Sequence, residues 1–331
     1  GIQAELLLKM ASLRLGILFL SETKCPGEDS YRSGEFFIIK IGRPRRETYG
    51  VAVIIHRKIM KSIFSIKAVN QHIISIQLKI TGGLFTLFGV YAPQEGRPLD
   101  ERNDFHNDLA DCIAAAARCG PLGVCGDLNC HLNYRLAGEE AALGPYLFCP
   151  APPDPNFHGE PKNRDLLVPL CISNNLCVTN TFLPKTPMQQ VTYFDRRAGS
   201  WNATTVDALF HKQLDIFIIS QTFRGSVLDI TSRRDVRVGN TNHHLQILKI
   251  RMPLQRRQRK PQRSVLPWDI WKNIEALKSL REARPALMAA LSAVPKKKTE
   301  ILPEYDPLGS DWPDPLLLYF DGSAAGRCAG W

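Results

Sequence analysis

The sequence predicts an α/β domain with mixed sheets, because strand-like and helix-like segments alternate over most of its 331 residues. Two runs rich in β-type residues, 73–80 and 84–91, flank the turn Thr81-Gly82-Gly83, which predicts an antiparallel hairpin. Other strand-like runs are separated by amphipathic segments of helical length. Hairpins and helical connections in one chain indicate a mixed sheet, and the last strand-like run of this series places the end of the domain near residue 252.

The first hundred residues predict one helix and five strands. Apolar residues at helical spacing predict a helix over 4–13. The strands that follow are short apolar runs bounded by Gly, Pro or charged turns, and they cover 15–21, 35–41, 49–56, 73–80 and 84–91.

The next 150 residues predict two helices and five more strands. Asp100 is the expected N-cap of one helix, and Asn163 is the expected N-cap of a second helix over 164–174, which Pro169 would strain or bend. The Pro- and Gly-rich stretch 138–161 predicts a long surface loop. The strands expected here are the one that contains Asp127, then 176–181, 191–194, 213–219 and 245–251.

Beyond the domain at 1–252 the sequence predicts a basic, proline-containing linker over 253–315 and a short last segment over 316–331. From Arg251 to Arg263, both included, there are six basic residues and no acid. As a nucleic-acid contact this arm would bind phosphates through Coulombic attraction, although a solvated linker explains the same pattern equally well. The linker also contains a helical stretch over 268–294, and the last segment contains a strand-like run over 316–323. The residues expected to contact phosphates are Arg256, Arg257, Arg259 and Lys260.

Composition favours a soluble protein with a polyanionic partner. The hydrophobic fraction of 44% and the charged fraction of 22% are typical of globular proteins, and the formal charge of +10 favours nucleic acid. The longest early apolar run, 15–20, is too short to span a membrane. The nine cysteines form no C-x-x-C pair, so we expect reduced, mostly buried thiols in an intracellular protein. A short Lys296-Lys297-Lys298 run adds weak support for nuclear import.

The most informative stretch is Gly126-Asp127-Leu128-Asn129, which ends an apolar run. If the strand continues through Asn129, the carboxylate of Asp127 and the amide of Asn129 project from the same face, because residues i and i+2 share a face. Such a pair suits a hard metal ion or a phosphate oxygen. A strand followed by an Asp/Asn-rich turn is the alternative interpretation.

Other polar residues occur where strands are expected to end. Glu22 follows the strand over 15–21, and Asp215 lies inside the apolar run 213–219. A buried carboxylate is costly unless a cation, metal or hydrogen-bond donor meets it, and His243 or His244 could supply that donor. Each residue singly has a structural explanation. Their common position at strand ends of one domain favours a functional site.

Five motifs occur in a fixed order: Ser21-Glu22-Thr23, Val90-Tyr91-Ala92-Pro93, Gly126-Asp127-Leu128-Asn129, Gln213-Leu214-Asp215 and Asn242-His243-His244. This ordered set resembles the endonuclease/exonuclease/phosphatase superfamily. Within that superfamily the chain looks most like the apurinic-type endonuclease domains of non-LTR (LINE-like) retrotransposons. The resemblance covers residues 1–252 and includes connecting stretches such as Asn163-Arg164-Asp165-Leu166-Leu167.

The resemblance implies a four-layer α/β sandwich, in which two packed mixed sheets are flanked by helices, and DNA cleavage that depends on Mg²⁺ or Mn²⁺. By this resemblance Glu22 binds the metal and Tyr91 contacts the scissile phosphate. Asp127 activates the attacking water, and Asn129 helps to hold it. Asp215 hydrogen-bonds His243, which stabilises negative charge on the phosphate. Asn242 takes the place of an aspartate that supports the metal site.

Two departures from the family pattern lead us to expect low activity. The family begins with a strand that bears a site asparagine, whereas this chain begins in the helix after it, so we expect the first strand to be missing and a sheet edge to be open. Asn242 also lacks the charge of the expected aspartate. A decayed nucleic-acid-binding relic, or a phosphatase or phosphodiesterase of the same fold, are the alternatives. A second resemblance places the start of a ribonuclease H domain at 316–331, with Asp321 as a metal ligand.

Overall fold

The computed structural model describes residues 2–42, 49–152, 159–195, 205–236, 238–239, 241–255 and the backbone of 316–321. The chain divides into two units, Gly1–Arg256 together with Pro313–Trp331, and Arg257–Trp312. Every element described below belongs to the first unit. Within the described ranges, no helix is both long enough and apolar enough to cross a membrane.

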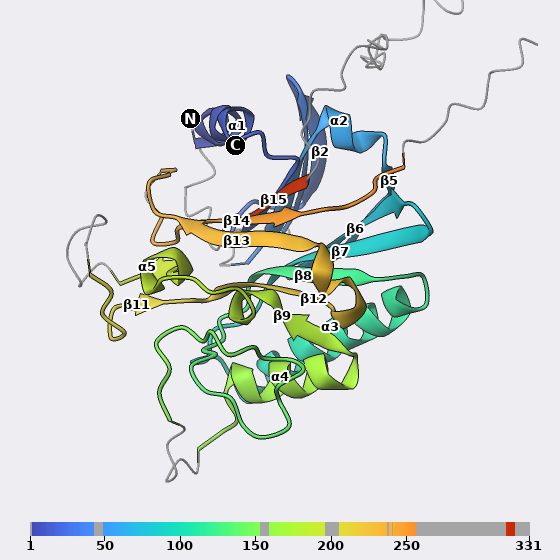
Figure 1. Cartoon of the computed structure of the whole chain (residues 1–331). Helices are drawn as coiled ribbons and strands as arrows, with labels where there is room; N and C mark the ends of the chain where they lie inside the picture. Colours follow the sequence, from blue (N-terminus) through green and yellow to red (C-terminus); the bar gives the residue numbers. More distant parts are fainter. Residues whose placement is uncertain are drawn as a thin grey trace, which may run out of the picture. The chain divides into compact units, whose positions relative to one another are not determined.

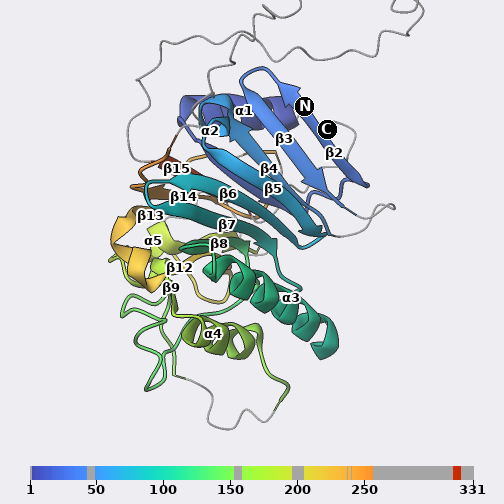
Figure 2. The same cartoon turned by 90° about the vertical axis from the view of Figure 1, so that its right-hand side faces the viewer.

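Two β-sheets pack face to face, and helices cover their outer faces (Figures 1 and 2). One sheet has seven strands in the order β13 (Val227–Arg233), β14 (Leu245–Ile250), β15 (Leu316–Asp321), β1 (Ile17–Ser21), β4 (Val51–His56), β3 (Phe36–Ile41) and β2 (Glu28–Ser33). The other has six strands in the order β5 (Ile63–Asn70), β6 (Ile73–Ile80), β7 (Gly83–Tyr91), β8 (Leu122–Asp127), β12 (Asp215–Ser220) and β9 (Leu176–Val178).

The helices and short elements complete the layers. Helix α1 (Ile2–Ser12) packs on the outer face of the seven-stranded sheet, and α3 (Leu99–Ala117) and α4 (Asn163–Ser173) pack on the outer face of the six-stranded sheet. The remaining described elements are α2 (Arg57–Met60), α5 (Pro187–Gln190), the hairpin of β10 (Tyr193–Phe194) with β11 (His211–Lys212), and 3₁₀ turns at Thr179–Thr181 and Gln221–Ser226. The prediction of a four-layer α/β sandwich is confirmed.

Three apolar clusters hold the layers together. The cluster between the two sheets includes Phe19 of β1, Leu87 of β7 and Phe217 of β12. The other two lie under the helices, where Leu6 packs in the cluster beneath α1 and Leu109 in the cluster beneath α3 and α4. A fully buried side chain of this size contributes about 1.5–3 kcal/mol through the hydrophobic effect. The central strands are apolar on both faces because each lies between a helix layer and the other sheet.

Several sequence predictions need correction. Residue Pro98 precedes α3, so Asp100 lies in the first turn rather than at the N-cap. Asn163 is not the N-cap but the first residue of α4, and its side-chain amide donates to two loop carbonyls. The backbone N–H of Lys162 donates to the Asp165 carboxylate. The expected strand over 176–181 ends at Val178 and continues as a 3₁₀ turn.

The predicted surface loop over 138–161 is not exposed throughout. Ala142 and Leu143 are completely buried, and Leu143 forms a β-bridge with Val178. A buried ion pair between Arg164 and Glu139 ties this loop to α4. The loop is therefore partly a core element.

Of the strand predicted over 316–323, residues Leu316–Asp321 form β15, which lies beside β1, and residues 322–323 lie outside the described part of the chain. That side of β1 is consequently paired rather than open, in contrast to the expectation of an exposed sheet edge. The predicted helical stretch over 268–294 and the Lys296-Lys297-Lys298 run lie outside the described residues, as do the basic residues Arg256, Arg257, Arg259 and Lys260.

Gly126 lets β8 approach β7 closely just before Asp127. Its φ is +136°, a conformation that is accessible almost only to glycine, and a Cβ placed there would lie 2.0 Å from the carbonyl oxygen of Val90. A side chain at this position would therefore push apart the two strands that carry Tyr91 and Asp127.

We expect Gly126→Ala to lower the free energy of unfolding by more than about 2 kcal/mol, because backbone strain and the clash with Val90 add. Chemical denaturation measures this change. Gly225→Ala is the matched control, because a Cβ there meets no atom within 4 Å. Equal stability of the two variants would contradict the proposed close approach.

Candidate active site

Three side chains meet at one edge of the six-stranded sheet because of strand register. Tyr91, the last residue of β7, pairs with Asp127, the last residue of the parallel strand β8. Asp127 also pairs with Asp215, the first residue of the antiparallel strand β12. Glu22 directly follows β1 in the other sheet, and the Tyr91 hydroxyl donates a hydrogen bond to its carboxylate. The two sheets thus contribute adjacent groups to one site.

A histidine lies between the two aspartates. Nδ1 of His243 is 2.8 Å from Oδ2 of Asp215, and its Nε2 is 3.9 Å from Oδ2 of Asp127. All three side chains are almost completely buried. The short contact fixes the imidazole orientation with Nδ1–H toward Asp215, so Nε2 faces Asp127 and the cavity.

The short strand β10 holds this histidine in place. Tyr193 forms a β-bridge with His243, and its ring packs edge-on against the imidazole at a centroid distance of 5.1 Å. The backbone N–H of His244 donates to the carbonyl of Thr192. The Thr192 hydroxyl in turn accepts hydrogen bonds from the backbone N–H groups of Leu214 and Asp215. One segment therefore fixes both Asp215 and His243.

Asn129 does not extend the strand, contrary to the expectation that β8 continues through it. The strand ends at Asp127, and Asn129 has a φ of +44° in the left-handed region. Oδ1 of Asp127 accepts a hydrogen bond from the backbone N–H of Asn129, which closes an Asx-turn. The amide of Asn129 donates to the carbonyl of Ala92. The structure thus agrees with the alternative interpretation of this stretch, a strand followed by a turn. The turn orients one oxygen of Asp127.

Asn163 ties the loops after β7 and β8 to helix α4. Its amide nitrogen lies 2.9 Å from the carbonyl oxygens of both Pro93 and Asn129, and its side chain is completely buried. The residue type and position predicted a helix N-cap. The side chain of Asn163 instead connects the helix to the two loops through hydrogen bonds to their carbonyl groups.

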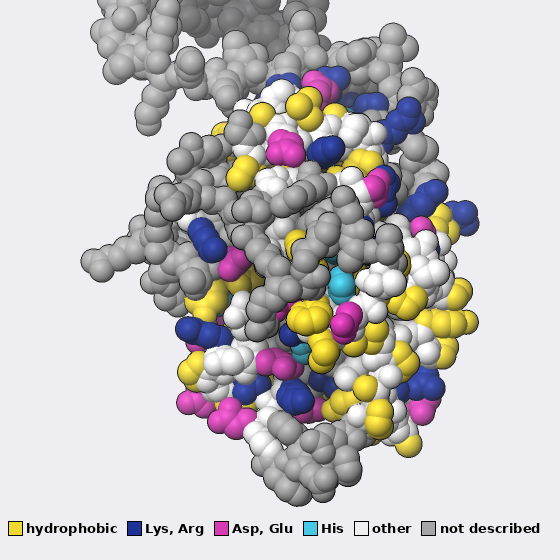
Figure 3. Space-filling view, turned by 90° about the vertical axis from the view of Figure 1, so that its left-hand side faces the viewer, with side chains coloured by type: hydrophobic (Ala, Val, Ile, Leu, Met, Phe, Trp, Pro, Cys, Tyr) yellow, Lys and Arg dark blue, Asp and Glu magenta, His cyan; other side chains and the backbone are white. Residues whose placement is uncertain are grey.

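A cavity of about 270 Å³ lies at this edge of the six-stranded sheet. On the face shown in Figure 3, histidine side chains are visible close to acidic and basic ones. Sequence reasoning identified Glu22, Tyr91, Asp127, Asn129 and His243 as site residues, and all five line the cavity. Reasoning from sequence missed the other lining residues, which are Gln94, Glu95, His131, Tyr193, Lys212 and Leu214.

The missed residues mostly follow or precede the identified motifs by a few positions. Gln94 and Glu95 come directly after the Ala92-Pro93 motif, and Lys212 precedes Gln213. Loops at strand ends build sites in α/β folds, so extending each motif by two or three residues would have found them.

Burial controls the protonation of the site. Burial raises the pKa of Asp127 well above its ordinary value, the charge of His243 lowers it and the charge of Asp215 raises it. Burial and the charge of Glu22 raise the pKa of Tyr91, so its hydroxyl stays protonated. Burial lowers the pKa of His131 to about 4, with Lys212 and Lys162 contributing in the same direction. The cavity thus combines a carboxyl of increased basicity with a neutral phenol and a neutral imidazole.

A divalent metal would find three carboxylates on the cavity wall, those of Glu22, Glu95 and Asp127. Glu22 lines the cavity with its side chain 21% exposed, and Lys24 lies 3.6 Å away. In the part of the chain that the structure describes, no group of three or more acidic, histidine or cysteine side chains could hold a metal alone. Mg²⁺ is commonly bound by one or two carboxylates, with waters and substrate phosphates as the other ligands. The donor set fits such a weakly held ion.

Asn242 lies apart from this donor set. Its carbonyl accepts a hydrogen bond from the backbone N–H of Phe194, and it is absent from the residues that line the cavity. Asn242 contacts the neighbouring β10 segment through its backbone, which supports the position of the adjacent His243.

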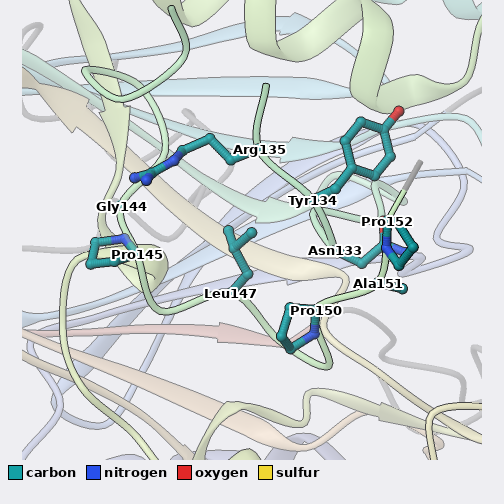
Figure 4. Close-up of a pocket in the computed structure, with 9 residues that line it drawn as sticks. All are labelled: Asn133, Tyr134, Arg135, Gly144, Pro145, Leu147, Pro150, Ala151 and Pro152. Carbon is teal, nitrogen blue, oxygen red and sulfur yellow. The ribbon is translucent and has the colours of Figure 1, made fainter. Parts of the chain in front are cut away.

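A second cavity, of about 380 Å³, lies in the loop after β8 (Figure 4). Tyr134 and Arg135 border it together with several prolines, and the described residues of its lining include no acid and no histidine. Among the described residues, acidic and histidine side chains gather instead in the cavity at the edge of the six-stranded sheet.

Two solved structures illustrate the similarity of this fold to known proteins. The catalytic domain of APE2 from Xenopus laevis superposes with a TM-score of 0.56 and 17% identity, covering 78% of this chain and 90% of that one. The 3′ phosphatase NExo from Neisseria, bound to a product DNA hairpin, gives a TM-score of 0.52 and 14% identity, covering 73% of this chain and 91% of that one.

Sequence comparison identifies two curated relatives, each matched over part of its length. No family model matches the chain. Craniofacial development protein 2 from Bos taurus is 25% identical over 248 residues, which cover 75% of this chain and 38% of that protein. The corresponding protein from Tragulus javanicus is also 25% identical over 248 residues, covering 75% of this chain and 39% of that protein. The chain therefore spans about two fifths of the length of these curated relatives.

The strand order, the flanking helices and the structural matches show that this chain shares its fold with the catalytic domain of APE2 and with NExo. The four-layer α/β fold implied by the five ordered motifs is therefore confirmed.

We expect NMR titration of the Asp127 carboxyl carbon to give a pKa above the ordinary aspartate value of about 3.9. His243→Gln should raise this pKa further, because it removes the positive charge that favours the carboxylate. Asp229, a partly exposed carboxyl on β13, provides the internal reference, and its carboxyl carbon signal should be the same in both proteins. A pKa of Asp127 that falls in His243→Gln would contradict the proposed coupling.

Proposed function

We propose that this chain is a metal-dependent DNA endonuclease that hydrolyses a phosphodiester and leaves a 3′-hydroxyl at the nick. The arrangement of Asp215, His243 and Asp127 in one buried line, open to a cavity that Tyr91 and Glu22 also border, carries the proposal. This arrangement places a base, Asp127, and an imidazole that can carry positive charge, His243, side by side toward a substrate phosphate.

Asp127 is the proposed base. Its Oδ1 is occupied by the backbone N–H of Asn129, so Oδ2 faces the cavity and His243. Its raised pKa makes it a better proton acceptor than an exposed carboxylate, since general bases work best when their pKa approaches the ambient pH. The water that loses its proton to Asp127 adds to phosphorus, and the bond from phosphorus to the 3′ oxygen breaks. The departing oxygen takes up a proton from solvent.

His243 and Tyr91 are the proposed contacts to the phosphate oxygens. Asp215 holds Nδ1 of His243, and a protonated His243 ring would stabilise charge that develops on the phosphate. Tyr91 remains a neutral donor because its pKa is raised, so its hydroxyl can transfer its hydrogen bond from Glu22 to a phosphate oxygen.

Glu22 is the proposed metal ligand, because it is the partly exposed carboxylate next to Tyr91. A bound Mg²⁺ or Mn²⁺ would neutralise phosphate oxygens. Glu22 would hold such an ion beside Tyr91, while Oδ2 of Asp127 faces the cavity and can accept a proton from water.

DNA is the proposed substrate, and a non-LTR retrotransposon the proposed origin. The formal charge of +10 and the structural similarity to a phosphatase bound to a DNA hairpin support a DNA partner. The ordered motifs and their connecting stretches support the origin. A nuclear location is consistent with this substrate.

We expect the protein to nick supercoiled plasmid in Mg²⁺ and not in excess EDTA. Asp127→Asn and His243→Ala should each lower the nicking rate by on the order of 10²-fold or more, because each removes a group that acts in the transition state. Gel analysis of plasmid relaxation measures the rate, and polymerase extension from the nick tests for a 3′-hydroxyl.

Glu28→Gln is the matched control, because this carboxylate is exposed on β2, and its rate should equal that of the unmodified protein. Nicking that is unaffected by Asp127→Asn and His243→Ala would contradict the proposed site.

Two competing functions give different outcomes in the same assay. The similarity to a 3′ phosphatase favours release of phosphate from a 3′-phosphorylated oligonucleotide without plasmid nicking. The uncharged Asn242, outside the cavity lining, favours a binding-only relic, which would retain DNA in a salt-dependent manner but release neither product.

A further inference from the structure

The seven-stranded sheet is continuous because of one strand that comes from far along the chain. Strand β15 lies between β14 and β1, parallel to β1 and antiparallel to β14. Residues 256–315 separate it in sequence from the described segment before it. Without β15, the pair β13–β14 would have no neighbour in the sheet formed by β1, β4, β3 and β2.

Both neighbours of β15 are core strands. Phe19 of β1 and Leu248 of β14 are at most 3% exposed and belong to the cluster between the two sheets. Removing β15 would uncover this cluster and leave two rows of backbone N–H and C=O groups without partners inside the domain. Buried backbone groups without hydrogen-bond partners are strongly unfavourable, so this position requires an extended peptide.

The register shows which peptide fits. Leu318 pairs with Ile17 on one side and with Leu248 on the other. Leu316 and Phe320 pair with further members of the same inter-sheet cluster. Because side chains alternate along a strand, a peptide with apolar residues at every second position matches this face.

The two neighbours of β15 also carry the two halves of the candidate site. β1 ends at Ser21, directly before Glu22, and β14 begins directly after His244. Asp321, the last residue of β15, is the register partner of Leu20, so the inserted strand ends at the same edge of the sheet. The width of one strand therefore sets the spacing between the segment of Glu22 and the segment of His243.

We propose that the gap between β1 and β14 is a binding site for an extended apolar peptide, that residues 316–321 of the same chain occupy it, and that its occupancy positions Glu22 relative to His243. The intervening segment is long enough to reach, since an extended chain spans about 3.3 Å per residue. A tethered strand also has an effective concentration on the order of millimolar, which favours the same chain over a second copy.

Paired cysteines in the full chain test the register. Lys249 is exposed and is the antiparallel partner of Leu317, so Lys249→Cys with Leu317→Cys should form a disulfide within one chain under mild oxidation. Lys249→Cys with Leu318→Cys is the matched control, because position 318 lies on the opposite face of the strand. Peptide mass mapping should give at least about tenfold more crosslink for the first pair.

A disulfide between two chains, seen as a dimer on a non-reducing gel, would show that a second copy supplies the strand and would overturn the proposal. Equal yields for the two cysteine pairs would overturn the register.

Cleavage of the tether tests the binding site. A protease site is inserted between residues 284 and 285 of the full chain. After cleavage, the C-terminal fragment should elute together with the N-terminal fragment in gel filtration, and the two should separate only in denaturant. Tyr319→Pro should release the fragment, because proline removes a backbone donor in the middle of a sheet. Leu308→Pro, outside β15, should leave it bound.

Prompt release of the unmodified fragment would overturn the proposal. Neither measurement depends on phosphodiesterase activity, so the outcome is independent of whether the proposed endonuclease is active.

Discussion

The burial of two carboxylates beside a single imidazole is the constraint on which the rest of the site depends. Asp127 and Asp215 are in register on neighbouring strands, and both are almost completely removed from water. Two unpaired buried charges would be strongly unfavourable, but His243 lies between them. The loops follow from this requirement, since β10 holds the histidine and the Asx-turn at Asn129 satisfies one oxygen of Asp127.

The same arrangement links the layers of the fold to the chemistry. Glu22 comes from the seven-stranded sheet, whereas Tyr91, Asp127 and Asp215 come from the six-stranded sheet. Their relative positions are fixed by the apolar cluster between the sheets, and Asn163 adds a link from helix α4 to the loops. A rigid scaffold of this kind keeps the groups oriented before substrate binds, which is the main requirement for electrostatic stabilisation of a transition state.

The sequence predicted central strands well and edge strands poorly. β1, β4 and β7 are buried on both faces, so their composition is continuously apolar. In the two large sheets, sequence reasoning missed β2, β5 and β13. Each is the outermost strand of its sheet, and its residues are more exposed and more polar. The ordered motifs identified the cavity residues, but the Asp215–His243 contact and the use of Asn163 as a tertiary donor depend on folding. Residue type alone suggested only a cap for Asn163.

The central place of β15 has a consequence for the order of events during synthesis. The ribosome makes β1 and β14 long before residues 316–321, so the sheet stays split while the intervening segment is being translated. Contacts between residues so distant in sequence form late and carry a larger loop-closure cost. Until then the apolar edges of β1 and β14 are exposed. A nascent chain in this state is a substrate for chaperones, and it is prone to aggregate with other nascent chains made on the same mRNA.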